Sequence, residues 1–290
     1  MYKLINFYSQ RFPFPHRGWK YFRRLLKSWR ILNREYRKKI FNGFYMLVTP
    51  SEHIQQQLFW YGYYEKPVSH LLEKLTKADS IILDIGAHIG YFTLVAAKIA
   101  KKGTVYAFEP VTKVFQRLQK NIEENNLSNV IPIHAAVGQL ANDAVIYISR
   151  EDNVGMSSLR PPENFSGFTQ PIPVMCVDEW IKETGIDNVG VIKLDVEGSE
   201  LFALQGMKQT LINLKPVVIV EINAATLSYF DLRPGDVVDF VLDLGYRCFN
   251  VTSSGFLERI GDEGFAENVA FIHTEKLEQF NYLVEQYGNF

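Results

Sequence analysis

The chain has 290 residues and a mass of 33.4 kDa, and 47% of its residues are hydrophobic and 22% charged. This composition excludes disordered, collagen-like and low-complexity proteins, and the length allows one large domain with a sizeable core. Only Cys176 and Cys248 carry thiols, which excludes a disulfide framework and fits a reducing compartment. No apolar run approaches the roughly 20 residues that cross a bilayer, and the N-terminus lacks the apolar stretch of a secretory signal. We therefore expect a cytoplasmic protein.

The net charge of −1 hides an uneven distribution along the chain. Residues 1–40 carry twelve Lys or Arg and a single acid, Glu35, whereas the other 250 residues carry 19 basic and 31 acidic side chains. In residues 18–40, apolar side chains recur at steps of three and four, which predicts an amphipathic helix with basic residues on its other faces. We divide the chain into a basic helical arm at 1–42, an aromatic lead-in at 43–78 and a main domain at 79–290.

Apolar runs alternate with helical patterns through the main domain. Pro67 opens a helical pattern at a favourable first-turn position. The strand-like runs are 81–86, 104–109, 130–137, 189–195 and 216–222, and the helical patterns between them are 91–101, 112–125 and 199–213. Continuous Val, Ile and Leu runs that alternate with helices are typical of a doubly wound, mostly parallel α/β sheet. Two further regions depart from this rhythm: strand-like pieces at 144–149 and 171–177, and an antiparallel pair at 246–251 and 268–273.

Four carboxylates end otherwise apolar strands. They are Asp84, Glu109, Asp195 and Glu221. Ligands of open α/β sheets bind outside the carboxyl ends of the strands, near the switch in strand order. The sequence therefore predicts a binding site at this edge of the sheet.

The turn after the first of these strands, residues 84–91, indicates the class of ligand. Gly86 allows a sharp turn close to a ligand, and Gly90 allows the following helix to pack on the sheet. Glu109 lies 23 residues after Gly86, where an acid accepts hydrogen bonds from ribose hydroxyls, so we expect a nucleoside-containing cofactor. His88 occupies the position of the second glycine of the dinucleotide fingerprint, which leaves only G-x-x-x-G. An acid two residues before the first glycine is what S-adenosylmethionine (SAM) enzymes use for the methionyl ammonium, although a plain strand–helix connection stays an alternative for the turn alone.

These motifs together resemble the FkbM family of SAM-dependent methyltransferases. The resemblance covers about residues 43–275, includes the lead-in Gly62–Glu65, and rests most on Ile82–Thr93, Tyr106–Pro110, Ile192–Glu200 and Val220–Ile222. It implies a class I fold with a seven-stranded Rossmann-like sheet, and O-methylation of a sugar, glycan or natural-product hydroxyl. The family usually has Asn where this chain has His88; both residue types tolerate positive φ, so we expect no loss of binding. The cofactor-binding residues predicted on this basis are Glu65, Asp84, Gly86, Ala87, His88, Gly90, Tyr91, Glu109, Pro110 and Ala136.

The predicted catalytic residues are Asp195, Glu197 and Glu221. Methyl transfer is an in-line displacement that needs the acceptor oxygen aligned, and a hydroxyl acceptor also loses a proton, so a positioned base is useful. Asp195 and Glu197 follow the fourth strand, where either one can orient or deprotonate the acceptor. The three carboxylates could instead hold Mg²⁺, although nothing in the sequence indicates a metal site. The structural alternative is that Glu197 and Glu200 only stabilise the N-terminus of the following helix.

Two questions stay open at this point. The basic arm, through residues 18–40, could contact an anionic membrane surface, so that the protein is peripheral at the inner membrane face, or it could dock on the acidic body; nucleic-acid binding is the least favoured of the three. The rival functions are a nicotinamide-dependent oxidoreductase, which the G-x-x-x-G spacing disfavours, and a non-catalytic adaptor. The sequence fixes neither the acceptor nor the oligomeric state.

Overall fold

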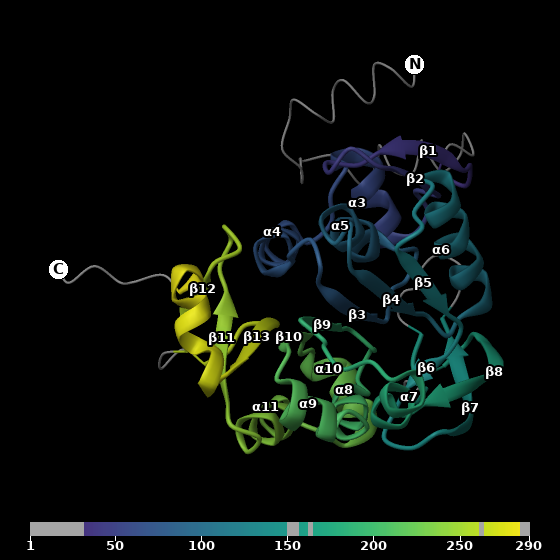
Figure 1. Ribbon diagram of the computed structural model, residues 1–290. Helices are drawn as coiled ribbons and strands as arrows, with labels where there is room; N and C mark the ends of the chain where they lie inside the picture. Colours follow the sequence, from purple (N-terminus) through teal and green to yellow (C-terminus); the bar gives the residue numbers. More distant parts are fainter. Residues whose placement is uncertain (1–31, 150–156, 162–164, 261–263, 285–290) are drawn as a thin grey trace.

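The computed structural model describes residues 32–149, 157–161, 165–260 and 264–284, and its centre is one large sheet (Figure 1). The strands of this sheet run in the order β12-β11-β13-β10-β9-β3-β4-β5. Their bounds are β3 Ile81–Ile85, β4 Thr104–Phe108, β5 Val130–Ile133, β9 Val191–Leu194, β10 Val217–Glu221, β11 Tyr246–Val251, β12 Leu257–Arg259 and β13 Asn268–His273.

The central sheet confirms the predicted doubly wound, mostly parallel α/β fold. Strands β5, β4, β3, β9 and β10 are parallel, whereas β13 pairs antiparallel with both β10 and β11. The prediction of seven strands is wrong by one, because the short strand β12 pairs with β11 and extends the sheet to eight. The polar spacing of residues 252–260 hid this strand, of which only Leu257 is buried.

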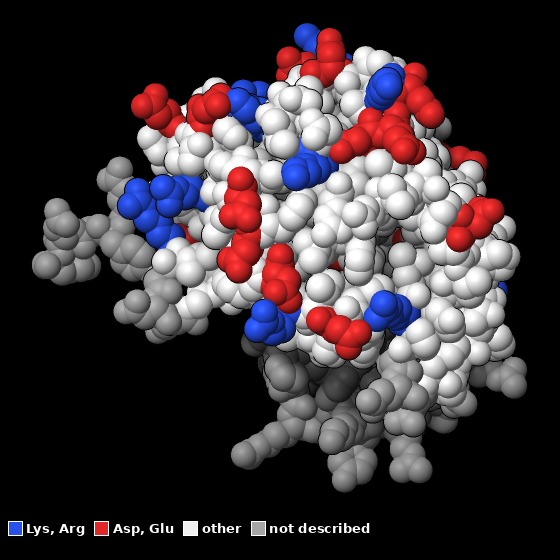
Figure 2. All heavy atoms as spheres, turned by 90° about the horizontal axis from the view of Figure 1, so that it is seen from below, with Lys and Arg blue, Asp and Glu red and all other residues white. Residues whose placement is uncertain are grey.

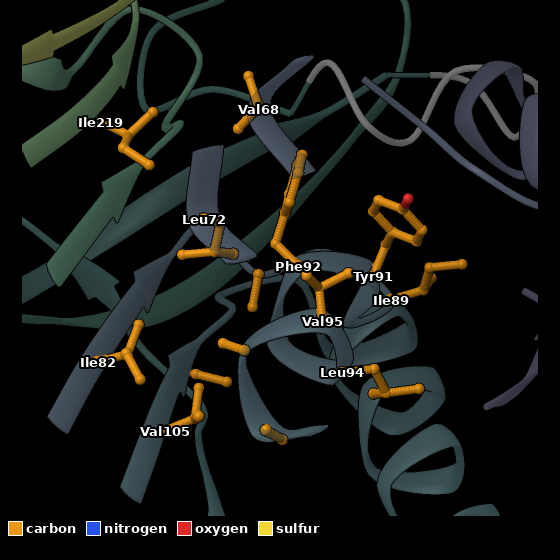
Figure 3. Close-up of a cluster of buried hydrophobic side chains, with 14 of the residues drawn as sticks. Val68, Leu72, Ile82, Ile89, Tyr91, Phe92, Leu94, Val95, Val105 and Ile219 are labelled. Atoms are coloured by element: carbon orange, nitrogen blue, oxygen red, sulfur yellow. The ribbon is translucent and has the colours of Figure 1, made fainter. Parts of the chain in front are cut away.

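Helices cover both faces of the sheet (Figure 1). Helices α4, α5 and α6 pack on one face, where Val68, Leu72 and Phe92 meet Ile82 and Ile219 of the strands (Figure 3). The second face packs against α7, α8, α9 and α11, because alternate strand residues point to opposite sides. The helix bounds are α3 His53–Tyr61, α4 Lys66–Leu75, α5 Tyr91–Ile99, α6 Thr112–Glu124, α7 Val177–Thr184, α8 Glu200–Gln205, α9 Lys208–Leu214, α10 Ala224–Leu227 and α11 Pro234–Leu242, with 3₁₀ helices at Ser228–Phe230 and Thr274–Leu283.

Two predicted elements are divided in the structure. The helix predicted at 199–213 is two helices, α8 and α9, separated at Gly206, where an added Cβ would lie 1.9 Å from the carbonyl oxygen of Gly138. The run 130–137 is also split, into β5 and a short strand, β6. Strand β6 belongs to a three-stranded sheet in the order β6-β8-β7, with bounds β6 Ala136–Val137, β7 Asn142–Ile148 and β8 Phe168–Met175. The pieces predicted at 144–149 and 171–177 are therefore strands, as expected.

The end of the basic arm is a β-hairpin, so the helix predicted over 18–40 is wrong in its last part. Strands β1 Tyr36–Lys39 and β2 Tyr45–Val48 pair antiparallel around Gly43, which has a φ of +93°. The Asn42-Gly43 pair is a strong hairpin signal, and here it overrides the helical spacing. The boundary predicted between residues 42 and 43 falls inside this hairpin. Residues 18–31 lie outside the described residues, so membrane contact through the arm stays a prediction.

Two surface properties bear on the predicted partners. On the face drawn in Figure 2, acidic and basic side chains are scattered in small groups among larger areas of other residues, and several of the acids lie beside a Lys or Arg. Among the described residues, no helix is both long enough and apolar enough to cross a membrane.

Candidate functional site

A pocket opens at the carboxyl ends of β3, β4, β9 and β10, where the sequence predicts a site. It encloses about 800 Å³, including the solvent at its mouth. Of the predicted site residues, those that line it are Gly86, His88, Glu109, Pro110, Ala136, Asp195, Glu197 and Glu221. The turn that is predicted to bind a nucleotide and the carboxylates that are predicted to be catalytic therefore lie on the walls of one cavity.

The turn after β3 is closed by backbone contacts. The N–H groups of Gly86 and Ala87 both donate to the carbonyl of Phe108, at 3.0 and 2.9 Å. A Cβ on Gly86 would lie 1.7 Å from the carbonyl oxygen of Asp195, so only glycine fits between β3 and β9. His88 has a φ of +50°, which confirms that this turn needs a residue tolerant of the left-handed region.

Glu109 ties the turn to the end of β4. Its carboxylate accepts the N–H of His88 at 2.9 Å and that of Val111 at 2.8 Å. Burial raises the pKa of Glu109 to about 7, against the effect of these two hydrogen bonds. Glu109 also lines the pocket, so a residue that shapes the turn is exposed to a ligand.

Five predicted cofactor residues lie behind the pocket wall rather than on it. Asp84 is 2% exposed and accepts from the Thr93 hydroxyl at 2.5 Å through Oδ2, while its Oδ1 has no hydrogen-bond partner. Burial also raises the pKa of Asp84. The others have structural surroundings: Gly90 precedes α5, Glu65 precedes α4, Ala87 is buried, and the Tyr91 hydroxyl accepts from Ser69.

The opposite wall of the pocket is acidic. Asp195, Glu197 and Glu221 come from the ends of β9 and β10. Burial, together with the charge of Asp195, raises the pKa of both Glu197 and Glu221. Glu197 has a φ of +52° and is followed by Gly198 at +99°, so the chain turns sharply here to bring the glutamate to the cavity. The three groups can orient a hydroxyl and exchange its proton.

Lys193 is the residue that sequence reasoning missed. It is 3% exposed within β9, and its ammonium donates to Asp195 Oδ2 at 2.9 Å. Burial lowers the pKa of this lysine, but the combined charges of Asp195, Asp84 and Glu65 outweigh burial and raise it above the ordinary value. The available signal was a charged residue inside an otherwise apolar four-residue strand.

The His88 ring has no partner of its own. Both ring nitrogens are buried and lack a hydrogen bond, although the residue lines the pocket. Burial lowers the pKa of His88 to about 4, so the ring is neutral at neutral pH. A neutral imidazole offers one donor and one acceptor to a bound molecule.

The sequence left open a Mg²⁺ site formed by the carboxylates of the pocket. In the part of the chain that the structure describes, no three or more His, Cys, Asp or Glu side chains are arranged to hold a metal ion.

Residues 84–248 match the family model described as the methyltransferase FkbM domain, which is more than half of the chain. The chain belongs to the FkbM methyltransferase family. The matched region begins at Asp84 and includes every pocket carboxylate. Family membership thus agrees with the resemblance carried by the turn after β3 and by the Asp195–Glu200 segment.

Two relatives and one solved structure are similar to this chain. The hexuronic acid methyltransferase AglP of Haloferax volcanii is 30% identical over 160 residues, covering 55% of this chain and 63% of that protein. The 2-O-methyltransferase NoeI of Sinorhizobium fredii is 27% identical over 165 residues, covering 50% and 67%. The match thus spans about two thirds of each relative. The crystal structure of an FkbM methyltransferase from Methylobacillus flagellatus superimposes with a TM-score of 0.44 at 20% identity, covering 68% of this chain and 44% of that one.

Proposed function

We propose that this chain transfers a methyl group from SAM to a hydroxyl oxygen of a sugar, glycan or related natural-product acceptor. The observation that carries the proposal is the shared cavity, in which the Gly86 turn and Glu109 face the carboxylates Asp195, Glu197 and Glu221. Cofactor-binding and proton-accepting groups must adjoin one another for methyl transfer, and here they line the same space.

The residues present fit the cofactor. Glu109 has oxygens with lone pairs left for ribose hydroxyls, and Asp84 has a buried oxygen with no partner, as expected of the anion behind a methionyl ammonium. Phe108, Pro110 and Ala136 give the same part of the pocket an apolar lining suited to an adenine ring. When bound, SAM supplies a methyl group that its sulfonium sulfur already activates.

The chain's own work is then to position the acceptor and take its proton. Asp195, Glu197 and Glu221 line the pocket, so their carboxylates can accept a hydrogen bond from a hydroxyl that binds there. Tyr64 and Ile54 line the same pocket from the lead-in and help to keep water out of it. The names of AglP and NoeI support a sugar hydroxyl as the acceptor class, because one denotes a hexuronic acid methyltransferase and the other a 2-O-methyltransferase.

The first test is calorimetric titration of the purified chain with S-adenosylhomocysteine, with NADH titrated in parallel. We expect micromolar binding of the first compound and none of the second. Binding of NADH alone would favour the oxidoreductase alternative, and binding of neither would favour the non-catalytic adaptor. Methyl transfer from radiolabelled SAM to a panel of sugars and glycans, analysed for alkali-stable ether products, then tests the acceptor class.

A further inference from the structure

Lys193 lies at the centre of the sheet, directly behind the acidic wall of the pocket. In the register of β9, it is paired with Asp84 of β3 on one side and with Ile219 of β10 on the other. Its side chain is 4% exposed. An ammonium removed from water to this extent needs an anionic partner to offset the loss of hydration.

The contacts of Lys193 fix it in one place. The ammonium donates to Asp195 Oδ2 at 2.9 Å and lies 4.6 Å from the centroid of the Phe92 ring. Asp195 is itself 20% exposed in its side chain and lines the pocket. The lysine therefore contacts the cavity only through the carboxylate that it holds.

This ion pair distinguishes Asp195 from the other carboxylates of the pocket. Among the described residues, neither Glu197 nor Glu221 forms an ion pair with a lysine or arginine. Their raised pKa values agree with this difference, since each is buried near the charge of Asp195. The titratable groups that face the pair or these glutamates are Tyr64, Glu65, Asp84, His88, Glu109, Glu197, Glu200, Glu221 and Glu267.

We propose that Lys193 is a positioning residue: its ammonium holds Asp195 in place at the pocket, so that Asp195 is the carboxylate that meets a cationic ligand centre. The inference rests on the proposed function, because it assigns that centre to the cofactor's sulfonium. Glu197 and Glu221, which form no such ion pair, then remain to accept the hydrogen bond and the proton of the acceptor hydroxyl. The three carboxylates, equivalent in the sequence, thus divide into one that faces the cofactor and two that face the acceptor.

The test compares two cofactor analogues that differ in charge at the reacting position. Sinefungin has a protonatable amine in place of the methylsulfonium group, whereas S-adenosylhomocysteine is uncharged there. We expect Lys193→Met to weaken sinefungin binding at pH 6.5 by about tenfold or more, with recovery toward pH 8.5, because the unpaired Asp195 takes up a proton that the ligand must displace. S-adenosylhomocysteine affinity should change by less than about threefold.

Proton exchange gives a readout that a merely structural role would not change. Calorimetry of sinefungin binding in buffers of different ionisation enthalpy should show more proton release for Lys193→Met than for the unmodified chain. Lys193→Arg should restore the original pH dependence. Lys215→Met is the matched control, since Lys215 also pairs with a carboxylate, Glu275, but on the surface.

Each outcome decides a different question. If Lys193→Met loses affinity equally for both analogues, with unchanged proton release, the positioning role is overturned and the cofactor assignment stays intact. Failure of both analogues to bind the unmodified chain would instead overturn the proposed function. If Lys193→Met does not fold, two isosteric variants, Asp195→Asn and Glu221→Gln, take its place. Asp195→Asn should abolish any preference for sinefungin over S-adenosylhomocysteine at pH 7. A larger loss of this preference in Glu221→Gln than in Asp195→Asn would contradict the inference.

Discussion

The two walls of the pocket satisfy their polar groups in different ways. On the wall formed by the ends of β3 and β4, the protein itself completes the contacts, since Glu109 accepts two backbone N–H groups and Gly86 leaves no space beside Asp195. On the wall formed by the ends of β9 and β10, the Lys193 ammonium pairs with Asp195, and among the described residues neither Glu197 nor Glu221 forms an ion pair. We call the first the scaffold wall, because backbone contacts fix its residues, whereas the second wall presents carboxylates to the cavity.

The largest effect should follow from disturbing the scaffold wall at Gly86. Gly86→Ala places a methyl group 1.7 Å from a backbone oxygen at a φ of +81°, so we expect a loss of more than about 4 kcal/mol in unfolding free energy, or no folding. Gly185→Ala is the control, because Gly185 also has positive φ but nothing within 4 Å, and should cost about 1 kcal/mol. Chemical denaturation measures both. Similar costs for the two variants would show that the close approach to Asp195 does not constrain the turn.

Glu109→Ala should have the next largest effect, because it removes the acceptor of two backbone hydrogen bonds. We expect a loss of about 2–4 kcal/mol in unfolding free energy and a weakening of S-adenosylhomocysteine binding by about tenfold or more. Glu109→Gln keeps one acceptor oxygen and should lose less of both. Unchanged affinity in a folded Ala variant would place the ribose elsewhere.

The scaffold wall was also the part that the sequence predicted best. Asp84, Gly86 and Glu109 stand at fixed places relative to apolar strands, and parallel strands bring their carboxyl ends to one edge, so local pattern determines their position. The same reasoning located Asp195 and Glu221 on the opposite wall. The parallel direction of the central strands also follows from the alternation of strands and helices.

What the sequence did not predict depends on contacts between distant segments. Lys193 and Asp195 are two residues apart, so the alternation along a strand is consistent with their pairing, but the burial of the ammonium beside Phe92 of α5 depends on a contact that spacing does not encode. Whether Asp84 lines the pocket or lies behind it depends in the same way on Thr93, whose hydroxyl occupies one of its oxygens. The hairpin at Tyr36–Val48 has a local cause, since Asn42-Gly43 favours a hairpin although the helical spacing of the apolar residues continues to Ile40.

A pH titration of stability tests Glu200, a buried carboxylate that follows the acidic wall in the sequence but does not line the pocket. Burial raises its pKa to about 7 in the folded chain, from an ordinary value of 4.5, so the folded state holds this proton more tightly than the unfolded state does. The contribution is full below about pH 4.5 and is lost as pH rises through 7. Glu200→Gln should therefore reduce the decline in unfolding free energy between pH 5 and 7 by about 1 kcal/mol per pH unit. Parallel curves for the two proteins would show that Glu200 does not titrate in this way.

The smallest effect should come from His88, whose two ring nitrogens are buried on the scaffold wall without a hydrogen bond. His88→Asn keeps a residue that tolerates a φ of +50°, so the unfolding free energy at pH 7 should change by less than about 1 kcal/mol. The imidazole pKa is lowered to about 4 by burial, so its contribution to stability is present above about pH 6.5 and is lost as pH falls through 4. The Asn variant should consequently lose less stability than the unmodified chain on acidification from pH 6.5 to 4.5.

Ligand binding by the same variant tests whether the His88 ring contacts the ligand. If the imidazole only fills space beside the turn, His88→Asn should bind S-adenosylhomocysteine within about threefold of the unmodified chain, as expected where both residue types suit the turn. A loss of about tenfold or more would mean that the ring nitrogens hydrogen-bond to the ligand. The scaffold wall would then also contribute side-chain polar atoms to ligand binding, as we expect of the acidic wall.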